Sequence, residues 1–281
     1  MKKIGFIDYY LDEWHANNYP EMIRKASGGS MEVAYAYAHR EPVYDELISN
    51  EKWSEKYGIP LIGSMEKLIE QSDYLIVLSP DNPEMHEELC KLPLMSGKRV
   101  YVDKTFAPDR AAAERIFNHA EKYGTPCYSS SALHFASEYT NLDRAGIQVL
   151  NSWGPGGFDT YSIHQLEPIV SILGSEAERV MFLGDEAYPS MIIEFSGGRR
   201  AQLAQFPGGS PFAMNIGYAD GRTTALTVES PFFQNCIEQI VRFFETGDIP
   251  VPHEQTLTVI GLREAGLKAM QKPYQWIKLF A

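Results

Sequence analysis

The sequence predicts an α/β protein with an N-terminal doubly wound parallel sheet, followed by an α+β domain with a mostly antiparallel sheet. Two observations carry this prediction. As far as Ser129, short apolar runs alternate with helical segments, which is typical of parallel strands joined by crossover helices. Beyond Ser129, strand patterns follow one another through hairpin turns, which indicates antiparallel pairing. We therefore expect domains at residues 1–129 and 130–281.

In the first half, each expected strand is a short apolar segment, and the helices carry start and stop signals. YLIVL at residues 74–78 is apolar throughout, as in a strand covered on both faces. Asn82-Pro83 is typical of a helix start and Gly124 of a helix stop. The expected strands are 3–8, 32–38, 59–62, 74–78, 99–103 and 126–129, and the expected helices are 12–25 (interrupted at Pro20), 44–57, 64–71, 82–92 and 109–123.

In the second half, strand patterns flank turn residues. Asp220-Gly221 lies between two such patterns and predicts a tight hairpin turn, whereas residues 154–157 (GPGG) predict a loop. The expected strands are 146–153, 191–195, 200–206, 213–218, 222–228 and 274–279, and the expected helices are 162–173, 231–246 and 254–270. Such a succession predicts antiparallel strands with helices on one face.

Composition narrows the class of protein. The chain has 281 residues and a net charge of −12, with no cluster of Lys and Arg, which argues against nucleic acid or an anionic membrane as a partner. No stretch approaches the roughly 20 apolar residues of a membrane span, and the N-terminus lacks a signal-peptide pattern. The three cysteines match no metal spacing. We therefore expect a cytoplasmic protein without a metal site.

The first strand does not run into the glycine-rich turn that usually binds a dinucleotide. In that turn, G-x-G-x-x-G lets the pyrophosphate approach the backbone N–H groups at a helix start. Residues 8–13 read DYYLDE instead, with no glycine and three carboxylates where phosphate would bind. Arg40 follows the second strand and suits a 2′-phosphate, or it is a solvated loop arginine.

Several segments in the correct order resemble the glucose–fructose oxidoreductase / inositol dehydrogenase (Gfo/Idh/MocA) family. Residues 72–104 are similar to its strand, Pro-Asn-x-x-His loop, helix, Gly-Lys turn and strand ending in Glu-Lys-Pro. Pro80 and His86 fall on the loop pattern, Lys104 falls on the lysine, and Asp103 replaces the Glu. The resemblance extends over nearly the whole chain.

A second motif of the family lies in the second half. Residues 156–174 are similar to its glycine run, Asp-x-Gly-x-His and following helix, and His164 falls on the histidine. The family's aspartate falls on Thr160, while Asp159 lies one residue early. Glu167 matches an acid three residues after the histidine.

The resemblance implies a Rossmann-like domain that binds NAD or NADP, and hydride transfer between the cofactor and a sugar, a polyol or a related carbinol. It implies that His164 takes the hydroxyl proton and that Lys104 stabilises the oxygen, with Asp159 beside them. It also implies a homodimer or homotetramer. The expected cofactor-binding residues are Asp8, Tyr10, Arg40, Pro80, Asn82, His86 and Asp103.

Other interpretations remain open. Lys104 also fits a surface lysine at a strand end, and His164 a partly buried helix histidine. The chain can be a binding or regulatory member that has lost nucleotide binding, since the first turn is acidic. It can also be a non-redox lyase or isomerase that uses Lys104, His164 and Glu167. A metal site made of His134, Glu138, Asp159 and His164 is a remoter alternative.

Overall fold

The computed structural model describes residues 1–279 and divides the chain into two compact units. The first unit comprises Met1–Ser130 and Gln234–Pro252, and the second comprises Ser131–Phe233 and the chain from His253 onward. The predicted fold class is confirmed, because the first unit holds a parallel sheet and the second a mostly antiparallel one.

The parallel sheet of the first unit has five strands in the order β2-β1-β3-β4-β5. The strands are β1 (Lys2–Asp8), β2 (Met31–Ala38), β3 (Tyr74–Val77), β4 (Val100–Val102) and β5 (Cys127–Ser129). The strand predicted at 59–62 is wrong, since only Leu61 forms a bridge, to Ala36. Pro60 has no N–H to donate, which limits this segment to a single point of pairing.

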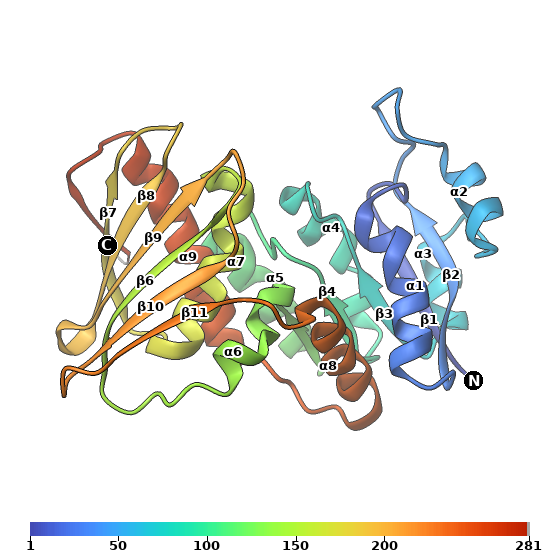
Figure 1. The fold of residues 1–281 in the computed structure, drawn as a ribbon. Helices are drawn as coiled ribbons and strands as arrows, with labels where there is room; N and C mark the ends of the chain where they lie inside the picture. Colours follow the sequence, from blue (N-terminus) through green and yellow to red (C-terminus); the bar gives the residue numbers. More distant parts are fainter. Residues whose placement is uncertain (280–281) are drawn as a thin grey trace. The chain divides into compact units, whose positions relative to one another are not determined.

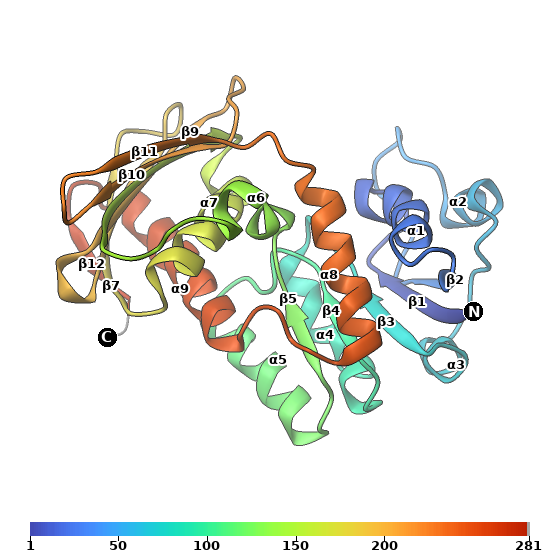
Figure 2. The same cartoon turned by 60° about the horizontal axis from the view of Figure 1, so that its bottom comes forward.

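The helices of the first unit lie on both faces of its sheet. They are α1 (Trp14–Ala26), α2 (Asn50–Tyr57), α3 (Met65–Gln71), α4 (His86–Cys90), α5 (Arg110–Lys122) and most of α8 (Phe232–Thr246), with 3-10 turns η1 (Pro83–Met85) and η2 (Pro93–Met95). In Figure 2, α1 and α8 lie over one face of the sheet and α3, α4 and α5 over the other. This arrangement follows from right-handed crossovers.

Three predicted helices differ in extent. Helix α1 continues through Pro20, because Tyr19 and Ile23 on either side are buried and hold it against the sheet. The helix expected at 44–57 begins only at Asn50, where the Ser49 hydroxyl accepts a hydrogen bond from the Lys52 N–H. The helix expected at 82–92 is shorter, because η1 and η2 replace its two ends.

The segment 234–252 belongs to the first unit. The expected division into residues 1–129 and 130–281 has a single boundary and therefore places this segment in the other domain. The ring of Phe244 stacks on Tyr74 with centroids 4.8 Å apart, and the ring of Phe243 lies edge-on to Tyr128 at 5.0 Å. Arg99 Nη1 donates a hydrogen bond to the Phe244 carbonyl at 2.6 Å. Both phenylalanines are fully buried, so α8 completes the core of the parallel sheet.

The second unit holds a seven-stranded sheet in the order β11-β10-β6-β9-β8-β7-β12. Strands β6 and β9 pair in parallel and their other neighbours antiparallel. Figure 1 shows α7 and α9 over one face of this sheet. The strands are β6 (Ile147–Pro155), β7 (Ala177–Leu183), β8 (Ser190–Phe195), β9 (Arg200–Phe206), β10 (Ala213–Tyr218), β11 (Thr223–Thr227) and β12 (Trp276–Lys278).

The helical elements of the second unit are α6 (Ser137–Thr140), α7 (Phe158–Leu173), α9 (His253–Met270) and the 3-10 turns η3 (Ala132–Phe135) and η4 (Ser196–Gly198). The predicted hairpin at Asp220-Gly221 is confirmed, and the expected strands at 191–195 and 200–206 also pair antiparallel, whereas strand β7 was not predicted. Helix α7 begins at Phe158 rather than Ser162. None of the helices within residues 1–279 combines the length and the apolar character needed to cross a membrane.

Candidate functional site

The carboxyl edge of the parallel sheet gathers polar side chains from three strands. Asp8 ends β1, residues 79–82 follow β3, and Asp103 and Lys104 follow β4. These strands are neighbours in the sheet, and ligands of open parallel sheets bind at this edge. A very small cavity is lined by Asp8, Tyr9, Tyr10, Glu13, Ser79, Pro80, Asp81 and Asn82. Four of the predicted cofactor-binding residues therefore meet there.

The N-terminus of α1 is capped by the side chain of Glu13. Its Oε2 accepts a hydrogen bond from the His15 N–H at 2.7 Å, and its Oε1 accepts one from the Ala16 N–H. These are the orphan N–H groups of a helix start, and the helix dipole favours a negative charge on them. The carboxylate of Glu13 thus holds the position that an anionic ligand takes at other helix starts.

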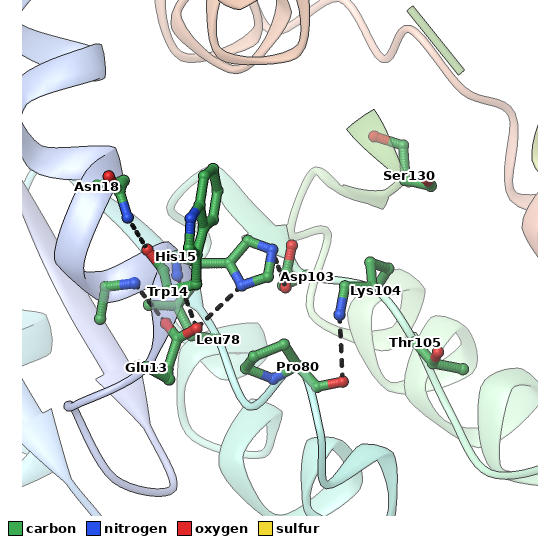
Figure 3. Close-up of polar contacts among 12 residues, drawn as sticks. Glu13, Trp14, His15, Asn18, Leu78, Pro80, Asp103, Lys104, Thr105 and Ser130 are labelled. Carbon is green, nitrogen blue, oxygen red and sulfur yellow. Dashed lines mark hydrogen bonds and ion pairs between the residues drawn. The ribbon is translucent and has the colours of Figure 1, made fainter. Parts of the chain in front are cut away.

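His15 lies between two carboxylates, as Figure 3 shows. Its Nδ1 is 2.9 Å from Glu13 Oε2, and its Nε2 is 3.7 Å from Asp103 Oδ2. Burial opposes the charged form most strongly, but Asp103 and Glu13 together outweigh it and raise the pKa of His15. The sequence analysis did not single out His15; its only signal was a histidine in the first turn after the acidic loop.

Asp8 is a buried carboxyl at the end of β1, with 1% of its surface exposed. Its Oδ1 accepts a hydrogen bond from the Tyr9 N–H at 2.6 Å, whereas its Oδ2 accepts none. Burial, and then the charge of Glu13, raise the pKa of Asp8 well above its usual range. Burial and the nearby Asp81 likewise raise the pKa of Tyr10 to about 12. Additional negative charge is therefore unfavourable in this cavity.

Lys104 follows Asp103 at the end of β4. Its Nζ donates to the Pro80 carbonyl at 3.4 Å, which holds the ammonium near the loop after β3 (Figure 3). The carboxyl of Asp103 accepts a hydrogen bond from the Tyr101 hydroxyl at 3.2 Å and is 1% exposed. The Lys104 ammonium thus lies at this edge of the sheet, on the residue that follows the buried Asp103.

Two predicted cofactor-binding residues have other contacts. Arg40 donates from Nη1 to the Tyr9 hydroxyl at 2.8 Å and lies over the Tyr9 ring, exposed to solvent. His86 is fully buried. Its Nε2 lies 2.6 Å from the Leu78 carbonyl and its Nδ1 3.0 Å from the Thr105 carbonyl. The ring has no exposed surface and joins two loops of the edge, and its contact with a cofactor stays a prediction.

In the second unit, Asp159 and His164 both lie on α7 but have different partners. Asp159 forms an ion pair with Arg263 of α9. His164 Nδ1 forms a hydrogen bond with the Ser131 hydroxyl at 2.7 Å. The prediction that Asp159 is the catalytic partner of His164 finds no support in these contacts, because Arg263 pairs with the carboxylate and Ser131 occupies Nδ1. Ser131 stood in the sequence only as the last of three serines.

The residues considered for a metal site are likewise engaged separately. His134 Nδ1 is 3.1 Å from Glu167 Oε2, and both side chains are buried. Glu138 accepts hydrogen bonds from the N–H and the hydroxyl of Ser230. With Asp159 paired to Arg263, these residues of the second unit form no common set of ligands.

A dinucleotide does not fit the phosphate position of α1 as the structure has it. The two N–H groups that would hold the pyrophosphate donate to Glu13, and the buried Asp8 lines the same small cavity. At about 4 Å, like charges repel by roughly 1 kcal/mol in water and several times more in a desolvated site. Glu13 would have to leave before phosphate could use these donors.

Residues 23–130 match an oxidoreductase family described as having an NAD-binding Rossmann fold, GFO_IDH_MocA. The resemblance to the Gfo/Idh/MocA family is confirmed. The matched range contains Lys104 and the loop after β3, and the predicted cofactor class, NAD or NADP, agrees with the description of the family. The match begins after the acidic turn at 8–13, the part of the sequence that departs most from the Gfo/Idh/MocA pattern.

Solved structures share the fold over almost the entire chain. A probable dehydrogenase from Thermotoga maritima is 16% identical with a TM-score of 0.80, covering 99% of this chain and 98% of that one. A myo-inositol 2-dehydrogenase from Lactobacillus plantarum is 11% identical with a TM-score of 0.79, covering 99% of each. GenD2 from gentamicin A biosynthesis, solved in complex with NAD, is 12% identical with a TM-score of 0.78, covering 100% and 97%. No curated protein matched the sequence.

Proposed function

We propose that the protein is a nicotinamide-dependent oxidoreductase that acts on a sugar, a polyol or a related carbinol. The observation that carries the proposal is the match of residues 23–130 to an NAD-binding oxidoreductase family. Neighbours in fold support the substrate class, since one of them is a myo-inositol 2-dehydrogenase. Association into a homodimer or homotetramer belongs to the same proposal.

The roles of individual residues follow from their chemistry. Lys104 presents an ammonium at the end of β4, and such a group stabilises the negative charge that develops on a carbinol oxygen. His164 suits proton transfer near neutral pH, and Ser131 fixes the orientation of its ring through Nδ1. We assign Lys104 and His164 these two roles, with Ser131 as a positioning residue.

The test has two stages. Fluorescence titration with NADH and NADPH comes first, because Trp14 in the first turn of α1 lies close enough to the acidic edge to report on a ligand. A screen of sugars and polyols with NAD and NADP follows. We expect Lys104→Ala and His164→Ala to lower kcat about 10²–10⁴-fold. Lys91→Ala, at an exposed lysine of the first unit, is the control and should leave kcat unchanged. Equal activity in all three variants would contradict the assignment.

A second candidate function is favoured by the contacts of Glu13. A family member whose phosphate position is held by its own carboxylate would be a binding or regulatory protein without redox chemistry. It predicts no binding of any of the four nicotinamide nucleotides at millimolar concentration. Turnover of a carbinol with NAD or NADP would exclude it.

A further inference from the structure

The acidic turn of this protein is ordered by bonds that a flexible loop would lack. Asp12, next to Glu13, accepts hydrogen bonds from the Asn17 side chain and from the Ile48 N–H. The Leu11 N–H donates to the buried Asn50 side chain at 3.0 Å. Glu13 itself has about 7% of its side chain exposed and contacts both the helix N–H groups and the His15 ring. The carboxylate is therefore held on α1 from several sides.

A second observation concerns the opposite wall of the same cavity. Oδ2 of Asp8 is buried and accepts no hydrogen bond, and Asp8 lines the cavity together with Glu13. A buried polar atom without a partner is rare and calls for a ligand, a water molecule or a functional reason. After burial, the charge of Glu13 is the next cause that raises the pKa of Asp8. Removing Glu13 would open a space that contains the helix N–H groups to which it now binds and the Asp8 carboxyl, which in its protonated form can donate a hydrogen bond to a phosphate oxygen.

We infer that the carboxylate of Glu13 is an internal occupant of the phosphate position of α1, and that a phosphate-bearing ligand binds there only when this carboxylate is displaced. The inference deepens the proposed function, on which it rests for the identity of the ligand as a nicotinamide dinucleotide. Dinucleotide affinity in the natural protein is then lowered by competition within the chain. Substitution of Glu13 should therefore raise the affinity for the dinucleotide.

The experiment measures the affinity of the full-length protein for NADH and for inorganic pyrophosphate by isothermal titration. Glu13→Gly removes the competing side chain, and glycine is well tolerated at a helix N-cap. Glu13→Gln removes only the charge and retains a side chain that still reaches the helix N–H groups. We expect Kd for both probes to fall at least tenfold in Glu13→Gly and to fall less in Glu13→Gln.

The matched control is Asp109→Gly. Asp109 caps α5 through the Ala112 N–H at 2.7 Å, so this variant loses a helix cap of the first unit without touching the acidic cavity. Thermal unfolding confirms that each variant is folded. If Glu13→Gly is unfolded, the affinity of Glu13→Gln tests the inference in its place. The affinity of Asp109→Gly for both probes should equal that of the natural protein. An equal gain in Asp109→Gly would overturn the inference.

The outcomes separate this inference from the proposed function. Weak binding of NADH by the natural protein and a tenfold gain in the variant support both. A gain in the variant, with no binding by the natural protein at millimolar NADH, supports the inference and contradicts the proposed oxidoreductase. Unchanged micromolar affinity overturns the inference and leaves the oxidoreductase. No binding by the natural protein or by either Glu13 variant overturns both.

Discussion

At the scale of single residues, the buried carboxyl of Asp8 makes a prediction about stability and pH. The pKa of Asp8 is raised in the folded protein. The stability that the protonated carboxyl contributes is therefore present at pH values below the pKa of Asp8 in the unfolded chain. It is lost as the pH rises through the pKa of Asp8 in the folded protein. Asp8→Asn keeps an acceptor for the Tyr9 N–H and cannot ionise. We expect it to raise the free energy of unfolding at pH 8 by about 1 kcal/mol or more, with no gain near pH 3.5.

Urea unfolding at several pH values measures this effect. Asp73→Asn is the control of opposite sign, because Asp73 accepts a hydrogen bond from the Lys2 ammonium and its pKa is lowered. That variant should lose stability at neutral pH and lose nothing in acid. A gain in Asp8→Asn that is the same at pH 3.5 and pH 8 would show that ionisation is not its cause.

The sequence indicates which side chains are suited to catalysis or ligand binding, but not which atoms each of them contacts. Lys104 was predicted from the resemblance of residues 72–104 to the family pattern, and the structure puts it at the carboxyl edge of the parallel sheet. His86 was assigned to a cofactor, and nothing in the sequence shows that its ring is enclosed by three carbonyls. Glu13 is the last residue of the turn recognised as acidic and His15 follows it closely, yet the capping of α1 by Glu13 depends on a side-chain conformation. Such contacts arise from tertiary packing.

At the scale of elements, Gly266 marks a close approach of α9 to its neighbours in the second unit. A Cβ atom there would lie 2.4 Å from Phe158 Cζ of α7 and 2.8 Å from Met191 Sδ of β8. We expect Gly266→Ala to lower the free energy of unfolding by about 1–3 kcal/mol, although alanine is the better helix former. Gly63→Ala has no atom within 4 Å of the new Cβ and should change it by less than about 0.5 kcal/mol. Urea unfolding in which Gly266→Ala equals Gly63→Ala would contradict this packing.

Elements with strong local signals were predicted, and those that depend on partners were not. The hairpin at Asp220-Gly221 and the buried run of β3 have short-range causes, and both occur in the structure. Strand β7 alternates buried Val180 and Phe182 with more exposed neighbours, but its sequence carries no turn signal that would have set its limits. The segment 59–62 has the composition of a strand, but Pro60 has no N–H to donate and the segment pairs with β2 at a single bridge, between Leu61 and Ala36.

At the scale of the whole molecule, the sequence predicted the order of the two sheets but not the path of the chain between them. Helix α8 follows β11 directly, so a boundary drawn along the sequence assigns it to the second domain. Its buried Phe243 and Phe244 instead pack on Tyr128 and Tyr74 of the first unit. The assignment of α8 to the first unit can be made only from its tertiary contacts. Its amphipathic pattern shows that one face is buried, but not against which sheet.

The sheet of the second unit carries apolar side chains on the face opposite α7 and α9. Along β7 and β8, Val180 and Ile193 are buried under the helices, whereas Met181 and Ile192 alternate with them and are half-exposed. Trp153 of β6 lies on the same outer face and lines an open groove with Phe206. Exposed apolar side chains that gather on one face of a protein favour self-association.

We therefore predict that the protein is a homodimer or homotetramer and that this outer face forms the contact. Light scattering after size-exclusion chromatography should give two or four times the monomer mass at micromolar concentration. Trp153→Glu combined with Ile192→Glu should shift the mass to that of the monomer, because two copies of an isologous interface would each bury unpaired charges. Lys91→Glu, an added negative charge on the first unit, should leave the mass unchanged. A natural protein that is monomeric, or a double variant that still associates, would exclude this face as the contact.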